Sequence, residues 1–100
     1  MAELLSDDQL DLILPKLPGW CPQDAALVRT VELPSFSHAI MVVNRVAEIA
    51  ENDNHHPDID IRWRTLTFRC STHSEGGITA SDTSLAEEID GVLDAVRGDD

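Results

Sequence analysis

The strongest constraint on the fold is a run of alternating apolar and polar residues between positions 58 and 70. Ile59 and Ile61 alternate with charged residues, and Leu66, Phe68 and Cys70 alternate with threonine and arginine. A two-residue period places one face of a strand against a core and leaves the other in solvent. Because the two runs are nearly contiguous, the pattern predicts an antiparallel hairpin that turns around residues 63–65.

Residues 35–52 carry the clearest helical pattern, because their apolar side chains recur three and four positions apart. Either Ser35 or Ser37 can cap the start of this helix. The predicted buried stripe comprises Phe36, Ala39, Ile40, Val43, Val46, Ala47 and Ala50.

Two further helices are predicted near the ends of the chain. Ser6 opens an S-x-x-Q capping box, and Pro15 lies where that first helix ends. Thr79 and Asp82 have the spacing of a cap and its N3 acid, ahead of an amphipathic run over residues 85–96. Gly98 fits the position just past the end of this last helix.

Two short segments, residues 20–22 and 26–33, have strand character and precede the long helix. The order is therefore helix, strand, strand, helix, strand, strand, helix. This order predicts an α+β fold, a four-stranded antiparallel sheet with three helices on one face. Residues 1–100 are predicted to form one domain.

The formal net charge of −12 argues against binding to nucleic acid or to anionic lipid, because both repel an acidic surface. No apolar run is long enough to span a bilayer, and there is neither a signal-like segment nor a CxxC motif. These features predict a cytoplasmic protein with reduced thiols. Cys70 is predicted to be a small core residue, and Cys21 to serve packing rather than chemistry.

Three of the four histidines flank the predicted hairpin. His55 and His56 precede its first strand and His73 follows its second, so we expect them to meet in space, whereas His38 is interpreted as a surface residue. Such a cluster is compatible with general acid–base catalysis, with a metal site, or with chance. The residues alone favour acid–base chemistry and chance equally. Metal binding ranks behind them, because neither an HxH nor an HExxH spacing is present.

The stretch from Glu51 to Asp82 resembles the signature of the pterin-4a-carbinolamine dehydratase family. The signature begins with an acidic residue, which three unspecified residues separate from a His-His-Pro sequence. An aromatic residue, a further histidine and an aspartate follow later in the chain. Its seven positions correspond here to Glu51, His55, His56, Pro57, Trp63, His73 and Asp82. The segments Leu17–Trp20 and Gly77–Thr79 also resemble the family. Asn54 and Ile59 depart from the residues of some relatives, but the proton-transfer groups are intact.

The resemblance implies a catalytic set and a substrate-binding set. His55 and His73 are the candidate general acids, His56 would orient the substrate or exchange roles with His55, and Glu51 would accept a hydrogen bond from an imidazole. The interpretation of Glu51 as a solvated helix residue stays open, and so do both a core and a stacking role for Trp63. Asp82 is interpreted as a helix cap first and a site residue second. The substrate-binding set implied by the resemblance comprises Asn54, His55, His56, Pro57, Ser71, Thr72, His73 and Ser74.

The family reaction removes water from a 4a-hydroxytetrahydropterin, and the resemblance implies that neither a metal nor another cofactor is needed. It also implies a homodimer or homotetramer and a place beside an aromatic amino acid hydroxylase. The alternative is a scaffold of the same fold without catalysis, such as a dimerisation or assembly factor that binds a protein client. The intact histidines favour the enzyme.

Overall fold

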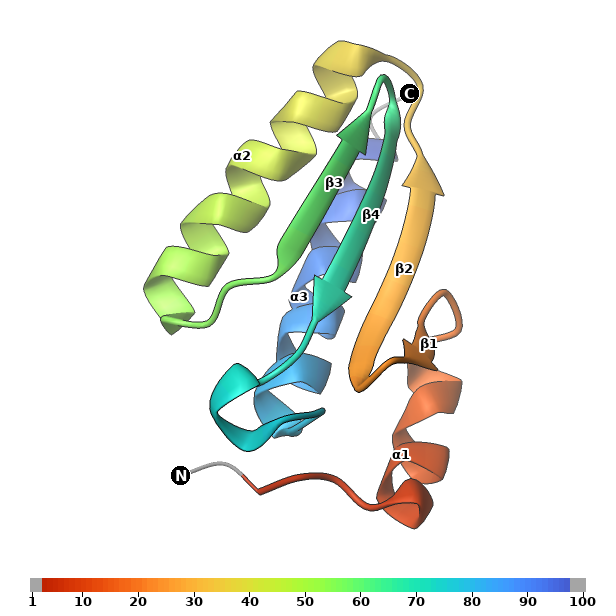
Figure 1. Ribbon diagram of the computed structural model, residues 1–100. Coiled ribbons are helices and arrows are strands. Elements are labelled where there is room, and N and C mark those ends of the chain that lie inside the picture. The colour runs from red at the N-terminus through yellow and green to blue at the C-terminus, as the bar shows by residue number, and fades with distance from the viewer. Residues whose placement is uncertain (1–2, 98–100) are drawn as a thin grey trace.

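The computed structural model describes residues 3–97. Within them the elements are α1 (Asp7–Ile13), β1 (Cys21–Gln23), β2 (Ala26–Glu32), α2 (Phe36–Asp53), β3 (Asp58–Arg62), β4 (Thr65–Cys70) and α3 (Ala80–Arg97), with the short 3-10 helices η1 (Leu14–Lys16) and η2 (His73–Glu75). The predicted order of elements and the α+β class are confirmed (Figure 1). Gly98, predicted to follow the last helix, lies outside the described residues.

The four strands form an antiparallel sheet in the order β1-β2-β4-β3. The alternation that predicted the hairpin decides which side of the sheet is buried. Leu66, Phe68 and Cys70 are fully buried and pack with apolar residues of α2 and α3, which cover one face (Figure 1). The opposite face is polar, and there the hydroxyls of Thr30 and Thr67 lie 3.0 Å apart across two strands.

Helix α2 begins after Ser35, whose hydroxyl accepts the backbone N–H of His38. The buried stripe of this helix is partly different from the predicted one. Phe36, predicted to be buried, is 51% exposed, because it is the first residue of the helix and the core begins one turn later. The buried residues of α2 are Ala39, Val42, Val46 and Ala50.

The two tryptophans have opposite environments. Trp20 is buried ahead of β1 and donates its indole N–H to Asp90 Oδ1 at 2.8 Å. Trp63 lies in the turn between β3 and β4 with φ at +54° and is 72% exposed, so the core interpretation of Trp63 is wrong. This turn is at the end of the hairpin opposite to the end that carries His55 and His73 (Figure 1).

The two cysteines should differ in reactivity. Burial, followed by the charges of Asp82, Asp58 and Asp90, raises the pKa of the Cys70 thiol to about 12, whereas Cys21 is exposed. Since the thiolate is the nucleophile, we expect iodoacetamide at pH 8 to modify Cys21 in the folded protein and Cys70 only after unfolding. Mass spectrometry of the labelled peptides with and without urea measures this. Equal labelling of both thiols in the native protein would contradict the burial of Cys70.

Candidate active site

His55 is positioned by the way helix α2 ends. Asn54 is the C-cap and adopts the left-handed conformation, with φ at +52°, which asparagine tolerates better than most residues. The next residue, His55, donates its backbone N–H to Ala50 O at 3.1 Å. The chain then leaves the helix and enters β3 at Asp58. His55 therefore lies at the end of the sheet where β4 stops and α3 starts (Figure 1).

His55 forms a short hydrogen bond with a buried carboxylate. Its Nε2 lies 2.6 Å from Oδ1 of Asp82, whose side chain is 0% exposed. The other carboxylate oxygen, Oδ2, accepts the hydroxyl of Thr72 at 2.8 Å and the backbone N–H of Thr79 at 2.9 Å. Both carboxylate oxygens of Asp82 therefore have hydrogen-bond partners, which offsets the cost of burying this side chain. A buried carboxylate that holds one imidazole nitrogen is a common arrangement for histidine proton transfer.

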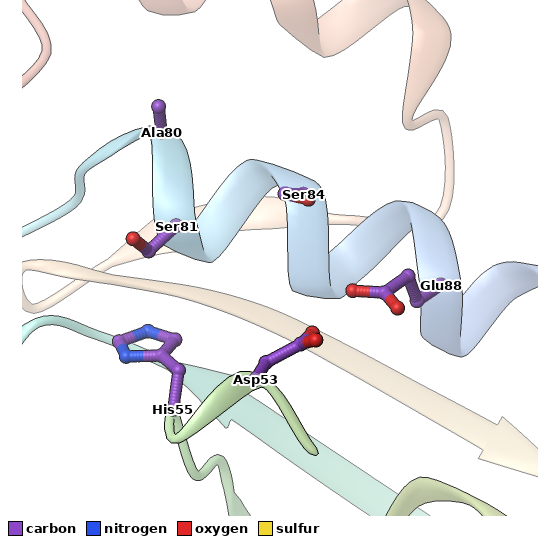
Figure 2. Close-up of a pocket in the computed structure, with 6 residues that line it drawn as sticks. All are labelled: Asp53, His55, Ala80, Ser81, Ser84 and Glu88. Atoms are coloured by element: carbon purple, nitrogen blue, oxygen red, sulfur yellow. The ribbon is translucent and has the colours of Figure 1, made fainter. Parts of the chain in front are cut away.

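An open pocket of about 550 Å³ lies beside this histidine, and we call it the His55 pocket. Its volume falls within the range of about 300–1,000 Å³ that small-molecule sites occupy. In Figure 2, His55 and Asp53 form one side, and residues of α3 form the other. The lining residues are Asp53, His55, Ala80, Ser81, Ser84 and Glu88.

Two acidic residues of the His55 pocket interact with each other. Asp53, at the end of α2, and Glu88, in α3, turn their carboxyl groups toward one another (Figure 2). A hydrogen bond with Asp53, together with burial and the charge of Asp53, raises the pKa of Glu88 above its ordinary value of 4.5. When both carboxyl groups are ionised, the hydrogen bond between them is lost and the two negative charges repel each other.

We expect Glu88→Gln to stabilise the protein at pH 7 by about 0.2–1 kcal/mol, because it removes the repulsion from Asp53. A raised pKa in the folded state favours folding when Glu88 is protonated, and this contribution is lost as the pH rises from 4.5 through the raised pKa. The gain should therefore be near zero at pH 4 and grow toward pH 7. Urea unfolding at both pH values measures it, with Glu87→Gln as the control for net charge. A gain independent of pH, or one equal to that of Glu87→Gln, would contradict the pairing.

His56 forms a second, more exposed pair. Its Nε2 lies 2.5 Å from Oε2 of Glu51, and the two side chains are 54% and 76% exposed. The predicted hydrogen bond between Glu51 and an imidazole is therefore present, and its partner is His56 rather than His55. Because both groups are well solvated, this pair orients its histidine less firmly than Asp82 orients His55.

His73 begins η2, directly after the Ser71-Thr72 segment that follows β4. It lines a smaller pocket of about 240 Å³ together with Arg69, Ser71 and other residues, and we call this the His73 pocket. His55 and His73 thus lie at the same end of the sheet but line different pockets. Thr72 connects the two regions, because it precedes His73 in the chain and binds the Asp82 partner of His55.

Most of the other predicted substrate-binding residues have structural contacts. The hydroxyl of Ser71 donates to Ala25 O in the turn between β1 and β2 at 2.9 Å. The hydroxyl of Thr72 is held by Asp82 and by Thr79 Oγ1, the latter at 2.7 Å. Pro57 is half-buried just before β3, and Ser74 is exposed in η2. Asn54 contributes the backbone turn described above.

Sequence reasoning missed several residues of the His55 pocket. Asp53 and Glu88 occupy polar positions of two helices and have no motif, so only the packing of α2 against α3 identifies them. Thr79 was recognised as a cap, and its hydroxyl does accept the N–H of Ser81 at 3.2 Å, but its contact with Thr72 has no sequence signal. Asp82 is both a capping residue and a partner of His55. Within residues 3–97, no group of three or more histidine, cysteine or acidic side chains is placed to hold a metal ion.

Fold and site together define a small α+β protein with a carboxylate-held histidine beside a ligand-sized pocket. Residues 3–92 match the family model described as pterin 4 alpha carbinolamine dehydratase. The chain is 58% identical, over 91 residues, to a provisionally named pterin-4-alpha-carbinolamine dehydratase of Mycobacterium sp. (strain KMS), covering 91% of this chain and 97% of that protein. A similarly named protein of Mycobacterium avium (strain 104) is 54% identical over 90% of this chain and 96% of its own length. This chain belongs to the pterin-4a-carbinolamine dehydratase family, a family of hydro-lyases.

Two solved structures share the fold. The crystal structure of a transcriptional coactivator/pterin dehydratase from Brucella melitensis superposes with a TM-score of 0.87 at 27% identity, covering 90% of this chain and 98% of that one. A pterin dehydratase-like protein identified as a RuBisCO assembly factor in the alpha-carboxysome has a TM-score of 0.64 at 16% identity, with coverages of 74% and 88%. The second likeness shows the fold alone. No helix within residues 3–97 is long and apolar enough to cross a membrane.

Proposed function

We propose that this protein is a 4a-hydroxytetrahydropterin dehydratase that uses His55 as a general acid. The observation that carries the proposal is the 2.6 Å hydrogen bond between His55 and the buried Asp82, beside a pocket of about 550 Å³. Membership in the dehydratase family supports the choice of substrate. The volume of the pocket suits a bicyclic heteroaromatic ring.

The reaction needs an acid because hydroxide is a poor leaving group. The proton on the imidazolium of His55 moves to the oxygen on C4a, and the C4a–O bond breaks to release water. Electron density from the ring nitrogens expels the leaving group, and loss of a ring N–H proton gives the quinonoid dihydropterin. When the proton from the ring N–H reaches His55, the imidazolium is restored for the next turnover. A positioned acid of this kind contributes about 10²–10⁴-fold to the rate.

His56 and His73 have supporting roles in this proposal. His56, held by Glu51, would help to orient the pterin. His73 stays the candidate for a second acid or for a substrate-binding group that approaches from the His73 pocket. The physiological role that follows is recycling of the hydroxylated pterin released by an aromatic amino acid hydroxylase, by a homodimer or homotetramer in the cytoplasm.

A stopped-flow dehydration assay tests the proposal. The 4a-hydroxytetrahydropterin is generated in situ, and its decay is followed by absorbance with the protein, with the protein plus a chelator, and in buffer alone. We expect the protein to accelerate the decay and the chelator to have no effect. A rate equal to that in buffer would sink the dehydratase proposal in favour of a non-catalytic scaffold of the same fold. Loss of activity in chelator would contradict catalysis by histidine alone.

A further inference from the structure

The hydroxyls next to Asp82 form a hydrogen-bonded chain whose direction is determined by the donors. The backbone N–H of Thr79 can only donate, and it donates to Asp82 Oδ2. The single hydroxyl proton of Thr72 also goes to Oδ2, at 2.8 Å. The 2.7 Å contact between the two threonine hydroxyls must then use the proton of Thr79. The hydroxyl oxygen of Thr79 in turn accepts the backbone N–H of Ser81.

The same contacts leave Oδ1 of Asp82 as the partner of the His55 ring. Asp82 Oδ2 is occupied by two donors, and Oδ1 faces His55 Nε2 at 2.6 Å. A carboxylate oxygen accepts hydrogen bonds, so Oδ1 pairs best with a hydrogen on Nε2. The ring then exchanges its other proton through Nδ1.

We infer that Thr72 is a positioning residue that, through Asp82, holds His55 in the Nε2–H tautomer and leaves Nδ1 as the atom that transfers the proton. The catalytic consequence rests on the proposed dehydratase function, whereas the tautomer does not. The inference gives Thr72 a different role from the substrate-binding role that its place in the Ser-Thr-His segment suggested. Its hydroxyl has one proton, and Asp82 takes it.

Three variants test this role. Thr72→Val removes the hydroxyl and keeps the branched shape, and Thr72→Ser keeps the hydroxyl. Thr67→Val is the matched control, because it removes the hydroxyl of a threonine pair at 3.0 Å on the polar face of the sheet. In the dehydration assay we expect Thr72→Val to lower kcat about 10-fold or more with KM within about twofold, by analogy with hydrogen bonds that orient metal-binding histidines. Thr72→Ser should recover most of kcat, and Thr67→Val should match the parent.

The tautomer is measured separately, by ¹⁵N NMR of the imidazole rings in the protein without substrate at a pH where His55 is neutral. We expect the His55 signals of the parent and of Thr72→Ser to be those of the Nε2–H form, and Thr72→Val to show an increased Nδ1–H population. A raised KM with unchanged kcat and an unchanged tautomer would overturn the inference and return Thr72 to substrate binding. If the parent fails to accelerate dehydration but shows the expected tautomers, the proposed function fails and the positioning role stands.

Discussion

Replacement of His55 by alanine should lower kcat for dehydration by about 10²–10⁴-fold, which is the usual contribution of a positioned acid. The reason is that the alanine variant has nothing beside the His55 pocket that can be protonated and also held by Asp82. Stopped-flow decay of the 4a-hydroxypterin measures the loss, and circular dichroism checks that the fold is retained.

Two further histidine variants serve as comparisons. His38→Gln is the control, because His38 lies in the first turn of α2, at the far end of that helix from His55. We expect it to retain the parent rate. His73→Ala should lose less activity than His55→Ala, because no hydrogen bond to the His73 imidazole is found within the described residues and no buried carboxylate orients it. If His73→Ala proved the more damaging, the principal acid would have to be assigned to the His73 pocket.

Substitution of Asp82 should damage both stability and rate. Asp82→Ala leaves the Thr79 N–H and the Nε2–H of His55 without an acceptor inside the protein, and each such group costs about 1–3 kcal/mol. We therefore expect the free energy of unfolding to fall by about 2–4 kcal/mol, as measured by urea denaturation monitored by circular dichroism.

Asp82→Asn separates the two effects. Asparagine keeps the size of the side chain, and its amide oxygen can still accept from Thr72 and Thr79, so we expect most of the stability to remain. Its amide NH₂ would then face His55 and favour the opposite tautomer. In hydrolases whose histidine is held by an aspartate, the same replacement lowers kcat by about 10⁴-fold for this reason. A stable Asp82→Asn protein with the parental rate would disprove a role for Asp82 in orienting His55.

Several parts of the fold could be predicted because their causes act over a few residues. The capping box at Ser6 was recognised, and Ser35 was one of two candidate caps, because such side chains bond the backbone within one turn. The β3–β4 hairpin followed from a two-residue period, which is confirmed by the burial of Leu66 and Phe68. The exposure of Phe36 and Trp63 could not be predicted in this way, because it depends on where neighbouring elements end.

The candidate site was only partly predictable for the same reason. The spacing of Thr79 and Asp82 predicted a helix cap, and that contact is local. The contact between Asp82 and His55 joins residues 27 positions apart, and no periodicity encodes it. The family resemblance placed both residues in one motif without assigning the bond. The separation of His55 and His73 into two pockets likewise depends on how the chain passes through Thr72 between them.

By itself, the sequence of this protein determined the order of its helices and strands, the buried face of its hairpin and the chemical groups available for proton transfer. These depend on residue type and on short spacings, so they can be recognised without coordinates. Only the tertiary structure decided that Asp82 holds His55, that Glu51 holds His56 and that His73 faces another pocket. Hydrogen bonds extend about 3 Å, so the packing of α2, β4 and α3 determines which donors and acceptors meet.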